Sequence, residues 1–158
     1  MDFTRQAGAG VVLVILTLCL QSAGMAILIR WARTALAGGA ANLGPFRAGV
    51  LMVRFTTLII VMQFLQILLW TAFYRWRILL PSWEASFYFS AATYSTVGYG
   101  DIVLPKVWRL LGPVEGVTGV LMSGLSVSGL FAIATRLVGG EAQPPSTKLR
   151  DSFTTTGT

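Results

Sequence analysis

Histidine is absent from the 158-residue sequence, and cysteine occurs once, at Cys19. Without histidine the chain lacks the commonest general base, the commonest transition-metal ligand and the usual sensor of pH near neutrality. A lone cysteine permits neither an intrachain disulfide nor a multi-cysteine metal site. No Ser/His/Asp, Cys/His or paired-carboxylate pattern is present either, so we expect neither an enzyme nor a small-molecule substrate.

Charge is also scarce, because 11% of the residues are charged whereas 54% are hydrophobic. This is too little polar surface to coat a soluble globule, so the composition predicts a membrane protein. The net charge of +6 would raise the question of nucleic acid in a soluble domain. Most of the ten arginines, however, flank apolar runs, where they are typical of membrane anchors. The expected partners are therefore membrane lipids and not nucleic acid.

Three apolar runs are long enough to cross a bilayer. The first lies between Arg5 and Arg30, and a cleaved signal peptide is the competing interpretation, although the run is longer than the apolar region of such a peptide. The second covers residues 55–74 and ends in aromatic residues that favour the headgroup level. The third covers residues 110–135 and is rich in glycine, with Glu115 as its single charge.

Polar side chains inside these runs have two interpretations each. Gln63 and Gln66 lie on one helical face, where they indicate either helix–helix hydrogen bonds or a polar lining. An acid inside a membrane span is a functional candidate by default. For Glu115 we favour a structural role, in which it bonds neighbouring backbone or Arg109.

A short aromatic segment, residues 83–95, separates the second and third runs and is too short to cross a bilayer alone. It predicts a re-entrant helix. Ser82 is the expected N-cap, and Glu84 in the first turn suits the positive end of the helix dipole. The opposite, partly negative end is then expected near Ser95, where it would favour a cation.

The six residues that follow this segment have the composition needed to replace the water shell of a bare cation. The proposed ligands are the backbone carbonyls of Thr96, Val97, Gly98 and Tyr99, with the Thr96 hydroxyl as a further ring. Gly98 and Gly100 permit backbone angles that most side chains forbid. Irregular backbone at membrane depth must be enclosed by protein, so several copies around an axis are required.

Two sets of side chains are expected to support this loop. An aromatic cuff from the short helix would face Tyr99, and its members are Trp83, Phe87, Tyr88 and Phe89. Asp101, just beyond the last glycine, would either hydrogen-bond the short helix or concentrate cations at the mouth.

The block from Trp83 to Asp101, followed by a glycine-rich span, resembles the pore domain of potassium channels. The resemblance implies an all-α membrane protein that assembles as a homotetramer and conducts K⁺ passively through a selectivity filter. It covers residues 55–137 and implies an outer helix at 55–74, a pore helix at 83–95, a filter at 96–101 and an inner helix at 110–135.

The same resemblance implies a glycine hinge in the inner helix. Gly119 and Gly124 bracket the expected position, and either glycine could instead serve close helix packing. Many bacterial pores of this family carry a carboxylate at the position of Ala92, so the buried acid pair that it would form with Asp101 is missing here.

The remaining segments lie outside the resemblance. Residues 1–33 form an extra span, and residues 34–54 form a cytoplasmic loop or interfacial helix. In that segment Arg47 and Arg54 share one face and are candidates for lipid contact. Residues 138–158 lack apolar periodicity and are expected to be disordered. If the filter faces outward, the N-terminus is outside and the C-terminus is cytoplasmic, in a plasma or bacterial inner membrane.

Two other functions fit parts of this pattern. A nonselective cation channel would keep the pore, although such relatives usually alter the tyrosine that stands here at Tyr99. A nonconducting membrane adaptor subunit would explain the extra first span. No span contains the internal arginine series of a voltage sensor, and the sequence does not specify the gating stimulus.

Overall fold

The computed structural model describes residues 2–37 and 45–139, and every regular element within these ranges is helical. The elements are α1 (Asp2–Ala37), α2 (Pro45–Trp76), α3 (Trp83–Tyr94), the 3₁₀ helix η2 (Lys106–Trp108) and α4 (Leu111–Gly139). Three stretches are long and apolar enough to cross a membrane, at Phe3–Thr34, Phe46–Trp76 and Lys106–Thr135. The predicted all-α class with three spans is confirmed.

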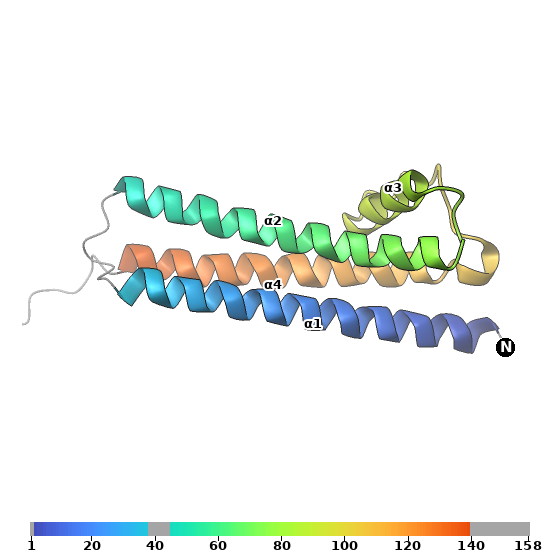
Figure 1. The fold of residues 1–158 in the computed structure, drawn as a ribbon, viewed down its shortest axis with the longest axis horizontal. Helices are drawn as coiled ribbons and strands as arrows, with labels where there is room; N and C mark the ends of the chain where they lie inside the picture. Colours follow the sequence, from blue (N-terminus) through green and yellow to red (C-terminus); the bar gives the residue numbers. More distant parts are fainter. Residues whose placement is uncertain (1, 38–44, 140–158) are drawn as a thin grey trace, which may run out of the picture.

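The three long helices lie side by side along the length of the molecule (Figure 1). The short helix α3 lies against the C-terminal part of α2, at the same end as the N-terminus of the chain (Figure 1). The other end holds the C-terminal end of α1, the start of α2 and the end of α4. α1 contacts both α2 and α4, so the extra N-terminal helix is an integral part of the bundle.

Helix α2 begins ten residues earlier than the outer helix we predicted at 55–74. Residues 45–54, expected within a separate loop or interfacial helix, continue this helix instead. Pro45 at its first position has a backbone angle already suited to a helix. Leu51 and Met52 then pack against a buried cluster formed by Leu28, Ala32, Phe55 and Ile133, which stabilises the extension. Residues 38–44 and 140–158, including most of the predicted disordered tail, lie outside the described residues.

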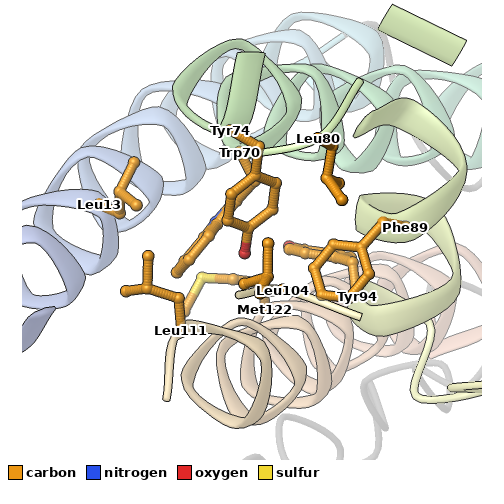
Figure 2. Close-up of a cluster of buried hydrophobic side chains, with 9 residues drawn as sticks. All are labelled: Leu13, Trp70, Tyr74, Leu80, Phe89, Tyr94, Leu104, Leu111 and Met122. Atoms are coloured by element: carbon orange, nitrogen blue, oxygen red, sulfur yellow. The ribbon is translucent and has the colours of Figure 1, made fainter. Parts of the chain in front are cut away.

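The main core lies where α3 meets the three long helices, and its nine buried side chains converge from all of these helices and the loops beside α3 (Figure 2). Tyr74 of α2 is fully buried there, with its ring edge-to-face against Phe89 of α3 at a centroid distance of 5.3 Å. Leu13 of α1 and Leu111 of α4 close the other sides (Figure 2). This packing fixes the position of α3 relative to the bundle.

Candidate functional site

The short helix α3 begins as the sequence predicts. Ser82 has extended backbone angles and its hydroxyl accepts a hydrogen bond from the backbone N–H of Ala85 at 3.0 Å. Glu84 lies in the first turn. At the other end the backbone N–H of Ser95 bonds the carbonyl of Ala91 at 3.1 Å, which closes the helix at Tyr94. The helix is therefore capped at both ends by its own local sequence.

The loop that follows α3 has an alternating backbone. Thr96, Gly98 and Gly100 have φ values of 62°, 52° and 77°, so every second residue lies in the left-handed region. The N–H groups of Thr96 and Gly98 return to the carbonyls of Thr93 and Ala92, at 2.9 and 3.0 Å. The positive φ of the two glycines agrees with the expectation from sequence. That of Thr96 was not expected, because a β-branched residue rarely adopts this conformation.

Two groups on α3 support the loop. The ring of Tyr88 stacks on that of Tyr99, with centroids 6.3 Å apart and planes 16° apart. The Tyr88 hydroxyl donates to Oδ2 of Asp101 at 2.9 Å, and this bond raises the pKa of Tyr88 above its ordinary value. We predicted that Asp101 would either hydrogen-bond the short helix or concentrate cations at the mouth, and the structure shows the hydrogen bond.

The other three members of the expected aromatic cuff lie elsewhere. Phe87 packs against Phe64 of α2, with ring centroids 5.5 Å apart, and Phe89 belongs to the core. Trp83 is exposed. The contact with Tyr99 thus comes from Tyr88, because a helix turns 100° per residue and presents neighbouring residues in different directions.

The loop itself is exposed in the single chain. All residues from 95 to 101 are exposed, and Val97 and Tyr99 reach 54% and 71% of their full accessibility. An exposed apolar strip follows along α4, formed by Val117, Val120, Leu121, Val127 and Phe131. The loop and this strip are surfaces that the chain alone leaves uncovered.

The partners of Glu115 differ from those we predicted. The carboxylate is fully buried and accepts from the Tyr74 hydroxyl of α2 at 2.6 Å and from the Ser90 hydroxyl of α3 at 2.5 Å. Neither Arg109 nor a backbone N–H supplies these bonds, because α4 turns this side chain toward the core between α2 and α3. The structural role that we favoured is present, with different partners.

The two glutamines of α2 form helix–helix hydrogen bonds. Gln66 donates to Gln21 of α1 at 2.7 Å, and Gln63 donates to Ser123 of α4 at 2.9 Å. The Tyr94 hydroxyl donates to the side-chain oxygens of both glutamines. Sequence reasoning missed Gln21 and Tyr94, although an amide at position 21 in an otherwise apolar span was a detectable signal.

The two hinge candidates have different surroundings. A Cβ at Gly119 would clash with the backbone carbonyl of Tyr94, so α4 needs glycine there to let α3 approach. Gly124 has no neighbouring atom within contact distance of such a Cβ. Gly119 is therefore a packing glycine in this conformation, and Gly124 has the free space that a hinge or an uncovered pore surface requires.

At the end of the bundle opposite α3, Arg54 lines a groove of about 360 Å³ between α1 and α2, together with Trp31, Thr34, Leu51 and Phe55. Arg47 is exposed on α2 but does not line this groove. The groove combines apolar walls with one cationic side chain.

Within residues 2–37 and 45–139, no cluster of three or more histidine, cysteine or acidic side chains could hold a metal ion.

These features define a multi-pass helical membrane protein whose short helix presents a loop with alternating backbone angles. Residues 56–136, about half of the chain, match the ion channel family, and the chain belongs to that family. The match covers most of α2, all of α3, the loop and nearly all of α4, and it leaves α1 outside. No curated protein and no solved structure matches the chain.

Proposed function

We propose that the protein is a potassium-selective channel that conducts K⁺ passively through the loop Thr96–Gly100. The observation that carries the proposal is the positive φ at every second residue of this loop, directly after a capped helix. Such alternation turns successive carbonyl oxygens toward one side, where they replace the hydration shell of K⁺. The Thr96 hydroxyl adds a further oxygen at the inner end.

The short helix α3 is re-entrant in this proposal. Tyr94 at its end hydrogen-bonds Gln63 and Gln66, which lie 13 and 10 residues before the end of α2. At 1.5 Å per residue, the loop begins roughly 15–20 Å below that end of the bundle. The partly negative C-terminal end of α3 is then directed at the inner part of the loop, where it favours a cation.

The proposed assembly is a homotetramer. Exposed irregular backbone is not tolerated in lipid, and four copies around one axis would enclose the loop and complete the rings of carbonyls. The exposed apolar strip of α4 would face the neighbouring subunits and the inner cavity. Because the N-terminus lies at the same end as α3, an outward-facing filter places the N-terminus outside (Figure 1).

Selectivity for K⁺ over Na⁺ is supported by the contact that holds Tyr99. Its ring is stacked on Tyr88, which is itself tied to Asp101. A loop held at this point keeps its carbonyls at a spacing that suits one ion size or one field strength. This favours a selective channel over a nonselective one.

The test is ion flux into liposomes that contain the purified protein and a Gly98→Ala variant. Alanine at φ 52° is strained, by roughly 1–2 kcal/mol, and we expect at least a tenfold loss of K⁺ flux with assembly retained. Gly49→Ala is the matched control, since Gly49 lies in helix α2 with open space around it. Equal K⁺ and Na⁺ flux would indicate a nonselective channel, and an inert monomer would indicate an adaptor.

A further inference from the structure

A chain of buried polar side chains connects four helices through one line of hydrogen bonds. Gln21 of α1 donates to the Ser126 hydroxyl of α4 at 3.0 Å and accepts from Gln66 of α2 at 2.7 Å. The side-chain oxygen of Gln66 accepts in turn from the Tyr94 hydroxyl of α3. All four side chains are buried. We call this line the amide relay.

The amide relay has a fixed direction. The Ser126 proton is directed to the backbone carbonyl of Met122 at 2.9 Å, so the Ser126 oxygen must accept from the nitrogen of Gln21. The oxygen of Gln21 therefore faces Gln66, which must present its own nitrogen. That leaves the oxygen of Gln66 pointing at Tyr94. Each amide is oriented by the one before it.

Tyr94 is thus held through its hydroxyl, which also donates to Gln63 of α2 at 3.1 Å, and through its backbone. Its hydroxyl is the last donor of the amide relay, and its backbone carbonyl lies against Gly119 of α4. Tyr94 is also the last residue of α3, immediately before the loop. The carbonyls of Ala92 and Thr93, in the same helical turn, accept from the N–H groups of Gly98 and Thr96. Any shift of Tyr94 therefore moves the anchors of the loop.

From this geometry we infer that α1 is an internal brace for the ion-conducting loop, and that Gln21 is a positioning residue which acts through Gln66 and Tyr94. The family match does not include α1, so this assigns a role to the helix that is extra to the pore. The inference that α1 sets the loop geometry rests on the hydrogen bonds alone. Its consequence for selectivity rests on the proposed function.

Ordinary helix packing is the competing explanation, and the same interface supplies a control. Thr17 of α1 accepts from the indole N–H of Trp70 of α2 at 3.1 Å, and both side chains are buried. This bond joins α1 to α2 without a hydrogen bond onward to α3. Thr17→Val removes the bond to Trp70 of α2, and Gln21→Met removes the bond to Gln66 of α2 together with the bonds of Gln21 to Ser126 and to the carbonyl of Met122 in α4. Each replacement is apolar and of similar size to the native side chain.

The first measurement is hydrogen exchange at the N–H groups of Thr96 and Gly98 in the assembled protein. We expect Gln21→Met to accelerate this exchange about tenfold, the effect of losing roughly one hydrogen bond, and Thr17→Val to stay within about twofold of wild type. Equal exchange in the two variants would overturn the brace. This readout does not require conduction, so it stands even if the protein proves not to conduct.

A double variant separates a relay from independent local effects. In a relay, Gln21→Met with Gln66→Met exchanges no faster than Gln66→Met alone, whereas independent effects multiply. Multiplied rates would contradict the amide relay. If Gln21→Met fails to assemble, Ser126→Ala tests the relay from its other end, and Ser128→Ala is its control because Ser128 bonds only locally to Leu125 on an exposed face. Equal exchange in these two variants would also contradict the relay.

The second measurement is the ratio of K⁺ to Na⁺ flux in liposomes. We expect Gln21→Met to lower this ratio several-fold and Thr17→Val to preserve it. If Gln21→Met accelerates hydrogen exchange in the loop but leaves the ratio of K⁺ to Na⁺ flux unchanged, Gln21 does not affect selectivity. Absence of flux in the wild-type protein would instead refute the proposed function, and the exchange experiment would still decide whether α1 braces the loop.

Discussion

Among the described residues, the buried acid Glu115 joins three helices. Its two carboxylate oxygens accept from hydroxyl groups of α2 and α3, and the residue itself belongs to α4. An acid inside a span is tolerated when its oxygens have partners in the protein interior. Tyr74 therefore depends on this one side chain for its acceptor, whereas the Ser90 hydroxyl also lies 3.1 Å from the carbonyl of Ile67.

We expect Glu115→Ala to destabilise the protein far more than Glu115→Gln. Alanine leaves a cavity and removes the acceptor of the buried Tyr74 hydroxyl, at a cost of about 2–4 kcal/mol. Glutamine keeps an oxygen for Tyr74 and can donate to Ser90, whose proton then goes to the carbonyl of Ile67 at 3.1 Å. Thermal unfolding of the purified assembly would check this. Similar losses for both variants would show that the bonds described here do not determine stability.

The roles of Gly119 and Gly124 in α4 can be distinguished by a pair of alanine variants. Gly119→Ala forces α4 away from the carbonyl of Tyr94, and overpacking of this kind costs about 1–3 kcal/mol. Gly124→Ala meets no neighbour within the chain and is the control for stability. We expect the first variant to lower the unfolding temperature, and the second to leave it unchanged while altering channel opening if Gly124 is the hinge. A stable Gly119→Ala protein would refute the packing role.

At the scale of helices, the predictable features were those decided by neighbours in sequence. The three apolar runs, the N-cap at Ser82 and the positive φ of Gly98 follow from local composition. The continuation of α2 back to Pro45 was missed, because the stabilising contacts of residues 45–54 come from α1 and α4. The charged residue Arg54, next to which we predicted the outer helix to begin, lies inside α2 and does not interrupt it.

The features that could not be predicted depend on which spans face each other. Gln21 and Ser126 are 105 residues apart, and no local pattern pairs them. The partners that we predicted for Glu115 were wrong for the same reason. The sequence indicates how far along α4 the residue lies, but not which neighbouring helix its side chain faces. Thr96 adopts a positive φ because bonds from the end of α3 fix the loop there, which overrides its own preference.

The groove at the other end of the bundle predicts a lipid contact. Its apolar walls suit an acyl chain, and Arg54 suits an anionic headgroup. We expect brominated anionic phospholipid to quench the fluorescence of Trp31 more strongly than brominated neutral phospholipid, and Arg54→Gln to abolish the difference. Arg47→Gln is the control, because Arg47 does not line the groove. Trp31→Phe identifies the signal, and equal quenching by both lipids would contradict the site.

For the whole molecule, the exposed loop and the exposed strip of α4 predict the assembly. The irregular backbone of the loop is stable at membrane depth only when protein encloses it, and the strip of α4 offers an apolar surface for contacts between copies. We expect native mass spectrometry of the detergent-extracted protein to give about four copies, as a ring of carbonyls from four loops requires. Polar substitution at Phe131, in the strip, should weaken the assembly, whereas the same change at exposed Phe3 on α1 should not. A monomer or dimer would contradict the tetramer.

The amide relay also has a consequence in time. Gln66 is synthesised 45 residues after Gln21, and Ser126 is synthesised 105 residues after Gln21. At a synthesis rate of about 5–20 residues per second, roughly 5–20 s pass between the synthesis of Gln21 and that of Ser126. During this interval the amide of Gln21 has no permanent acceptor in the lipid, which favours retention of α1 beside the insertion machinery until α4 emerges. The helix made first thus has the longest interval before its contacts are complete.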